Sequence, residues 1–221
     1  REVEGPFRKA WDVSADGNYA ITFHSYDVTP RRRVDLRTGQ AVDFDLPNAR
    51  ILQLSSDGSK LYYEVGYDIR QYSFATGTSV SVPVVGAPAG WNYFDLVDVS
   101  ANGRYLGLSG GKEATAEISV FVYDTVTHEW RRPDDLLAPF PPESGIIRTS
   151  QEVSLSADGR YAAWAAMATA GSRRQVFVYD WQTNTAVIAS PRLDGAPFSD
   201  GFGASNPQIS PDGREVVFRA N

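Results

Sequence analysis

One short segment occurs five times along the chain, and it limits what the chain can fold into more than any other feature. Each copy alternates apolar and polar residues and ends in Ser-x-Asp-Gly or Ser-x-Asn-Gly. The serines lie 41 to 56 residues apart, at Ser14, Ser55, Ser100, Ser156 and Ser210. Asp-Gly and Asn-Gly dipeptides accept the positive φ that a tight hairpin turn requires. The repeat therefore predicts five β-hairpins.

A second hairpin follows the first in four of the five units. After each Ser-x-Asp-Gly or Ser-x-Asn-Gly turn comes an apolar strand, and then a further strand that ends in a second turn. The residues that close this second turn are of types that enter the left-handed region more often than most, namely Gly39, Gly77, His128 and Asn184. Each complete unit is thus predicted to contain four antiparallel strands, termed a to d in chain order.

Units of four short strands at this spacing are typical of the blades of a β-propeller. We expect an all-β chain that forms a single propeller domain over residues 1–221, with four complete four-stranded antiparallel blades and the first half of a fifth. The expected blades cover residues 9–46, 50–84, 94–133, 151–190 and 206–221. The b strands are almost continuously apolar, which indicates that both of their faces are covered.

The fifth copy reads Ser210-Pro-Asp-Gly-Arg214, and the fourth reads Ser156-Ala-Asp-Gly-Arg160. In these residues the chain resembles the WD40-like, TolB-type propellers, whose PD40 repeat has Ser-Pro-Asp-Gly-Arg followed by an apolar strand. The resemblance covers essentially the whole chain and implies a bacterial protein in the periplasm, on the cell surface or secreted. It indicates the fold strongly and the function weakly, because propellers have many unrelated activities.

The fifth unit contains only strands a and b before the sequence ends at Asn221. Half a blade leaves an unpaired strand edge, which favours aggregation or the binding of another strand. We therefore expect the chain to be part of a longer propeller of about six to eight blades. The remainder of its own chain or a neighbouring subunit is expected to complete the fifth blade.

The loops on one side of the expected propeller are the candidate binding surface. In an antiparallel meander the a–b and c–d turns leave from one side, and the b–c and d–a connections leave from the other. The second set is long and irregular, and such loops on a rigid scaffold commonly carry recognition. The candidate binding residues on this rim are Trp91, Asn92, Tyr93, His24, Tyr26, Phe140 and Arg148.

Two of these groups have a purely structural alternative. The aromatic cluster at residues 91–94 either anchors a protein interface or a sugar, or folds inward and plugs the mouth of the central channel. The proline-rich segment 139–142 is either a second binding element or a rigid linker between blades.

Strand a of each unit is expected to be innermost, so its polar position should line the central channel. The residues at this position are Asp12, Gln53, Asp98, Ser154 and Gln208. The two carboxylates among them, Asp12 and Asp98, would suit a bound cation or a polar ligand. The alternative is that the channel simply holds water.

No catalytic residue, metal site or cofactor is predicted. The segment Gly107-Leu-Ser-Gly-Gly111 fits the Gly-x-Ser-x-Gly nucleophile pattern, but that motif needs a helix after the serine, and here a Gly-rich loop follows. His128 occupies a turn position, which is a sufficient explanation for it. Asp134 and Asp135 are expected to be solvated carboxylates of a d–a loop. The chain has no cysteine, and its two histidines lack a zinc-binding spacing.

The net charge of −6 argues against a nucleic-acid partner. No segment approaches the roughly 20 apolar residues that a membrane span needs. We expect a non-catalytic binding scaffold for a protein partner or an extracellular polymer. Two alternatives stay open: the propeller domain of an enzyme, either a prolyl-oligopeptidase-type substrate gate or a polysaccharide-active propeller, and a structural module of a surface assembly.

Overall fold

The computed structural model describes residues 9–23, 31–115, 117–137, 149–167, 173–190 and 203–220. Their regular structure is β-strand, apart from one 3-10 turn in this part of the chain, η1 (Pro133–Leu136). None of these residues forms a helix long and apolar enough to cross a membrane. The chain divides into two compact units, residues 1–82 and 83–221.

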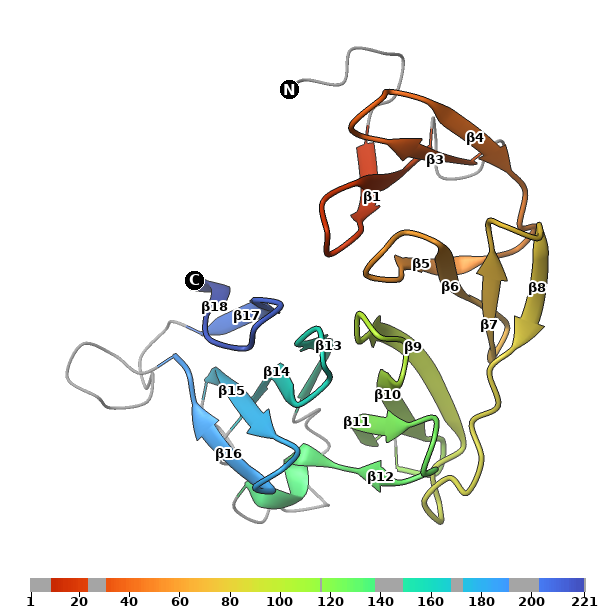
Figure 1. The fold of residues 1–221 in the computed structure, drawn as a ribbon. Coiled ribbons are helices and arrows are strands. Elements are labelled where there is room, and N and C mark those ends of the chain that lie inside the picture. Colours follow the sequence, from red (N-terminus) through yellow and green to blue (C-terminus); the bar gives the residue numbers. More distant parts are fainter. Residues whose placement is uncertain are drawn as a thin grey trace. The chain divides into compact units, whose positions relative to one another are not determined.

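The first unit contains two four-stranded antiparallel sheets, in each of which the strands lie in chain order (Figure 1). The first sheet consists of β1 (Lys9–Val13), β2 (Tyr19–Phe23), β3 (Arg31–Asp35) and β4 (Ala41–Phe44). The second consists of β5 (Arg50–Leu54), β6 (Lys60–Val65), β7 (Asp68–Ser73) and β8 (Thr78–Ser81). Their shared core contains Ile21, Phe44, Leu54, Leu61 and Tyr63.

The second unit contains two more sheets of this kind and one two-stranded sheet. The strands of the third sheet are β9 (Tyr93–Val99), β10 (Tyr105–Lys112), β11 (Glu117–Asp124) and β12 (Trp130–Arg131). Those of the fourth are β13 (Thr149–Leu155), β14 (Tyr161–Met167), β15 (Arg174–Asp180) and β16 (Thr185–Ile188). The last sheet pairs β17 (Ala204–Ile209) with β18 (Val216–Ala220). Fully buried Trp164 lies in the core between the third and fourth sheets.

The predicted turns are confirmed by the backbone angles. The glycines of all five Ser-x-Asp-Gly or Ser-x-Asn-Gly segments have positive φ, between 64° and 73°. The residues predicted to close the second turn do so as well, including the two that are not glycine: His128 has a φ of 60° and Asn184 of 52°. In addition, the His128 ring Nδ1 lies 2.7 Å from the Tyr123 hydroxyl, so its side chain also fixes the turn.

A tyrosine from one sheet packs on the turn glycine of the next sheet. A Cβ atom at Gly58 would overlap the ring of Tyr19, and a Cβ at Gly159 would overlap the ring of Tyr105. Gly213 has the same relation to Tyr161. These glycines are therefore needed for their lack of a side chain as well as for their φ. This tyrosine–glycine contact joins consecutive sheets within each unit.

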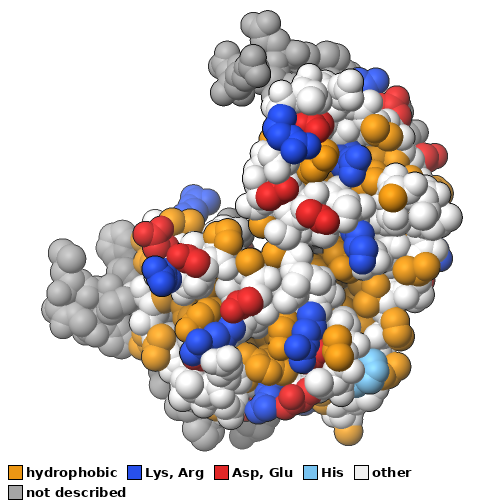
Figure 2. Space-filling model, in the orientation of Figure 1, with side chains coloured by type: hydrophobic (Ala, Val, Ile, Leu, Met, Phe, Trp, Pro, Cys, Tyr) orange, Lys and Arg blue, Asp and Glu red, His pale blue; other side chains and the backbone are white. Residues whose placement is uncertain are grey.

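Arginine side chains cover some of these tyrosines on the outside. The Arg104 guanidinium carbon lies 5.1 Å from the centroid of the Tyr105 ring, and that of Arg160 lies 4.8 Å from the Tyr161 ring. Figure 2 shows Lys and Arg side chains lying beside hydrophobic ones on this face of the second unit. The aliphatic stems and planar heads of the arginines thus shield the aromatic rings from water.

Candidate functional site

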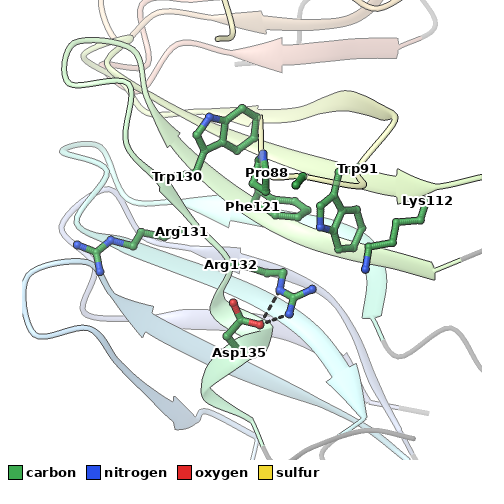
Figure 3. Close-up of a pocket in the computed structure, with 9 residues that line it drawn as sticks. Pro88, Trp91, Lys112, Phe121, Trp130, Arg131, Arg132 and Asp135 are labelled. Carbon is green, nitrogen blue, oxygen red and sulfur yellow. Dashed lines mark hydrogen bonds and ion pairs between the residues drawn. The ribbon is translucent and has the colours of Figure 1, made fainter. Parts of the chain in front are cut away.

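A hollow of about 390 Å³ lies beside the third sheet, within the second unit (Figure 3). Its lining comes from the connection between β8 and β9, the end of β10, the middle of β11, β12 and η1. The lining residues are Pro88, Ala89, Trp91, Lys112, Phe121, Trp130, Arg131, Arg132 and Asp135. Trp91 lies in a d–a connection, whereas Lys112 is the last residue of β10. Trp91 is thus the one lining residue that was also a candidate of the predicted binding rim, and the binding role of that rim stays a prediction.

Aromatic rings form the apolar part of the hollow. Trp91 meets Phe121 edge-on, with ring centroids 4.8 Å apart, and Phe121 is itself almost fully buried. Phe94 packs against Phe121 at 5.3 Å and against Trp130 at 4.7 Å. Edge-to-face pairs at these distances stabilise one another beyond the burial of their area. The Trp91 ring is therefore held in place but remains partly exposed.

Glycines in β10 make room for this aromatic cluster. A Cβ atom at Gly110 would lie 2.6 Å from Phe121 and 2.8 Å from Phe94, and one at Gly111 would overlap the ring of Tyr93. Both glycines belong to the Gly-x-Ser-x-Gly segment. The prediction of a Gly-rich loop after Ser109 is wrong, because β10 continues through Gly110 and Gly111 to Lys112 and pairs with β11 there. The segment is a strand on which rings pack.

The loop that carries Trp91 is anchored to the sheet at both ends. The Trp130 indole Nε1 donates to the Val85 carbonyl at 2.8 Å, and the Val85 N–H donates to the Tyr123 hydroxyl at 3.2 Å. At the other end, the Asn92 N–H donates to the Gly111 carbonyl at 2.9 Å. These hydrogen bonds make the hollow a preformed site, which lowers the entropy cost of binding.

Charged side chains form a row beside Trp91. Lys112 Nζ lies 2.8 Å from Glu117 Oε2, and Arg132 Nη1 lies 3.5 Å from Glu117 Oε1. Arg132 also donates to Asp135, with Nε 2.6 Å from Oδ1. Burial alone would lower the pKa of Arg132, but the hydrogen bond to Asp135 and the carboxylates of Asp135 and Glu117 outweigh burial and raise it. Arg132 is therefore a permanent positive charge in the hollow.

The predicted rim residues have different positions. Trp91 lines the hollow, whereas Asn92 and Tyr93 do not belong to its lining. Asn92 is exposed, and its Oδ1 accepts a hydrogen bond from the Glu113 N–H at 3.2 Å. His24, Tyr26, Phe140 and Arg148 lie outside the described residues, so their part in binding stays a prediction.

Three of the residues predicted to line the channel link one sheet to the next. The Asp12 carboxylate accepts a hydrogen bond from the Leu54 N–H at 2.6 Å, and the Asp98 carboxylate accepts one from the Leu155 N–H at 2.6 Å. The Ser154 hydroxyl accepts one from the Ile209 N–H at 3.2 Å.

Burial raises the pKa of Asp12, although the N–H groups of Leu54 and Val13 act in the opposite direction. Gln53 is half-buried and Gln208 is exposed. A structural linking role is thus visible for three of the five positions, and the lining of a channel stays a prediction for all five.

The prediction that Asp134 is a solvated carboxylate is wrong. Asp134 is buried, and it accepts hydrogen bonds from the Ser119 hydroxyl at 2.7 Å and from the Trp164 indole at 2.9 Å. It therefore joins the third sheet to the fourth. Its neighbour Asp135 is exposed, as expected.

The sequence analysis did not select most of the residues that line the hollow. Lys112, Phe121 and Arg132 are separated along the chain and meet only because β10, β11 and β12 pair side by side. The one available signal was the run Trp130-Arg131-Arg132, which places an aromatic ring and two cations at β12 and at the residue that follows it. In the part of the chain that the structure describes, no group of three or more His, Cys, Asp or Glu could hold a metal ion.

These features define the class of the protein: it is all-β, and its four four-stranded antiparallel sheets are arranged as propeller blades, with a further two-stranded sheet. The structure matches TolB-type β-propellers over its full length. It is similar to the putative TolB from Agrobacterium tumefaciens, with 18% identity and a TM-score of 0.64, over 100% of this chain and 73% of that one.

Two enzyme structures match as well. An oligogalacturonate lyase in complex with manganese has 14% identity and a TM-score of 0.64, and the match covers 99% of this chain and 62% of that one. A structure from a study of two prolyl endopeptidases has 15% identity and a TM-score of 0.56, over 91% of this chain and 30% of that one. At these identities the likeness concerns the fold alone. No protein-family model and no curated protein sequence matches the chain.

Proposed function

We propose that this propeller is a non-catalytic binding module that takes its ligand in the hollow beside Trp91. The observation that carries the proposal is a partly exposed tryptophan, packed edge-on against the buried Phe121 ring and flanked by charged side chains. Binding sites for small ligands have volumes of about 300 to 1,000 Å³ and combine apolar walls with a few polar groups. The hollow has both properties.

The ligand is a protein partner or an extracellular polymer, and the protein acts in the periplasm, on the cell surface or outside the cell. The fold it shares with TolB supports this location. The walls of the hollow come from five different segments of the third blade and its flanking connections, so a single group of the ligand that enters it can contact several of them.

The test is a binding screen of the purified chain against immobilised glycans and peptides, repeated with Trp91→Ala. We expect Trp91→Ala to lose most of the binding, because a tryptophan at the centre of a site commonly contributes more than about 2 kcal/mol. Tyr67→Ala is the matched control, since Tyr67 is an exposed aromatic residue in the β6–β7 connection and lies outside the hollow. Equal binding by wild type and a folded Trp91→Ala protein would contradict the proposal.

A second candidate is the propeller domain of an enzyme, because the same fold occurs in an oligogalacturonate lyase and in prolyl endopeptidases. Its test is direct: the purified chain is incubated with oligogalacturonate, with and without manganese, and with a proline-containing peptide. Cleavage that Trp91→Ala abolishes would replace binding by catalysis as the role of the hollow.

A further inference from the structure

One carboxylate of the chain lies between two cations beside Trp91. Both oxygens of Glu117 are used, Oε2 toward Lys112 Nζ at 2.8 Å and Oε1 toward Arg132 Nη1 at 3.5 Å. The same two cations approach the tryptophan: Lys112 Nζ lies 4.6 Å and the Arg132 guanidinium carbon 5.6 Å from the centroid of the Trp91 ring. Lys112 and Arg132 thus form an anion-binding pair that the protein's own side chain occupies.

The contact with Glu117 is weak enough to be replaced. The Glu117 side chain is 43% exposed, and ion pairs at such positions contribute little because water and salt screen them. Lys112 and Arg132 line the hollow, whereas Glu117, their shared partner, is not part of the lining. A ligand carboxylate that enters the hollow can therefore compete with Glu117 for the two cations.

We propose that the hollow binds a uronic acid residue of an acidic polysaccharide, with the sugar ring against Trp91 and its carboxylate between Lys112 and Arg132, and that Glu117 competes for this position. The inference rests on the proposed function and names the ligand class for the same site. The body of a pyranose ring presents C–H groups that pack on an indole, while its hydroxyls need donors and acceptors. Asp135 supplies an acceptor at the edge of the hollow, and the two cations supply donors.

The lining favours a sugar acid over the end of a peptide. Peptide C-termini are commonly bound by clustered backbone N–H groups, and extended peptides pair with an exposed strand edge. Here the described contacts to the cationic groups of Lys112 and Arg132 come from side chains alone, and Figure 3 shows Lys112 beside Trp91 and Arg132 paired with Asp135.

The experiment compares two probes by titration calorimetry: an oligosaccharide of β-linked glucuronic acid residues, and the same compound with its carboxyl groups methyl-esterified. We expect wild type to prefer the acid. Glu117→Gln should raise the affinity for the acid by about threefold to fivefold, the range that an exposed ion pair can contribute, and leave the ester unaffected. Lys112→Met should abolish the preference.

The matched control is Glu129→Gln. Glu129 pairs with Arg131, another cation of the lining. The Glu129 side chain is 45% exposed, and the Glu117 side chain is 43% exposed. This variant removes one negative charge near the hollow without freeing the Lys112–Arg132 pair, so it should leave both affinities unchanged. Thermal melting confirms that each variant is folded.

The outcomes separate the two proposals. If Trp91→Ala loses binding but Glu117→Gln does not gain affinity for the acid, the uronic acid inference is wrong and the binding function stands. The inference also fails if wild type binds the ester as well as the acid, or binds a peptide C-terminal carboxylate more tightly than the sugar acid. If Trp91→Ala changes nothing, both proposals fail.

Discussion

At the scale of single residues, two glycines with the same backbone conformation have different neighbours. Gly17 and Gly58 close equivalent turns in the first unit, with φ of 70° and 64°. No atom lies within 4 Å of a Cβ built on Gly17, whereas one built on Gly58 meets the Tyr19 ring. Alanine substitutions at the two positions therefore measure two free-energy costs separately: that of the left-handed conformation at Gly17, and that of the conformation plus a steric overlap at Gly58.

We predict that Gly17→Ala lowers the free energy of unfolding by about 1 kcal/mol, because alanine is strained at positive φ. Gly58→Ala should cost about 1 to 3 kcal/mol more, since the new methyl group must displace Tyr19. Urea denaturation of both variants measures the difference. Equal losses would contradict the role assigned to the tyrosine–glycine contact.

A second prediction at this scale concerns the pair Arg104–Asp124. Burial alone would raise the pKa of Asp124, but the Arg104 guanidinium and the N–H groups of Val126 and Thr127 lower it from 3.8 to about 2. Because the pKa is lower in the folded state, ionised Asp124 stabilises the fold above about pH 4. This contribution is lost as the pH falls from 3.8 toward 2.

The stability difference between wild type and Asp124→Asn should therefore be constant above about pH 5 and shrink between about pH 4 and pH 2. Urea midpoints measured across this range provide the test. A difference that stays constant down to pH 2 would show that Asp124 acts only through its shape and its neutral hydrogen bonds.

At the scale of strands and sheets, the Asp98 carboxylate links the third sheet to the fourth, where β9 and β13 do not pair as neighbouring strands. The register of β9 shifts near Asp98, and the freed side chain accepts hydrogen bonds from its neighbour Val99 at 2.8 Å and from Leu155 in β13 at 2.6 Å. Such shifts redirect a side chain out of the regular pleat. The irregularity of β9 is therefore what links it to β13.

We predict that Asp98→Ala lowers the free energy of unfolding by about 2 to 3 kcal/mol, because it leaves the Leu155 N–H buried without its charged acceptor. Gln208 holds the equivalent position in β17 but is exposed, so Gln208→Ala should change stability by less than about 0.5 kcal/mol. Thermal unfolding of the two variants checks both values. A small loss for Asp98→Ala would contradict the linking role.

The strands and turns could be predicted from the sequence because their signals are local. Alternating residues and Asp-Gly turns specify each hairpin within about ten residues, and even the left-handed conformation of Asn184 follows from its residue type and position. The hollow could be predicted only through Trp91. Lys112 and Arg132 come together only because β10, β11 and β12 pair with one another. The burial of Asp134 depends on Trp164, which is 30 residues away in the sequence and donates a hydrogen bond to its carboxylate. No periodicity in the sequence encodes such contacts.

At the scale of the whole molecule, the two-stranded sheet exposes a strand edge. Among the described strands, β18 pairs with β17 alone, and Val217 in β18 is 68% exposed. A strand edge with an exposed apolar side chain is a template for another strand. We propose that this edge is where a further strand, from the same chain or a neighbouring subunit, completes the sheet.

We predict that the isolated chain associates at high concentration and that Val217→Lys reduces this association, because an edge lysine opposes strand pairing. Val126→Lys is the control: Val126 is 67% exposed and lies in the turn between β11 and β12, away from a strand edge. Sedimentation velocity measures the effect. Equal reduction by both variants would mean that the loss of apolar surface, and not the edge, is responsible.

The contact between Tyr105 and Gly159 has a consequence for how such a chain can grow in evolution. The first, third and fourth repeat units each supply a ring, that of Tyr19, Tyr105 and Tyr161, to the turn glycine of the unit that follows. A gene duplication that copies such a whole unit therefore supplies both the tyrosine and the turn glycine that the new contact needs. A copy whose boundaries are shifted can supply the tyrosine without the glycine. Lengthening by complete units needs no compensating mutation at this contact, so the contact favours repeats whose boundaries stay in step along the sequence.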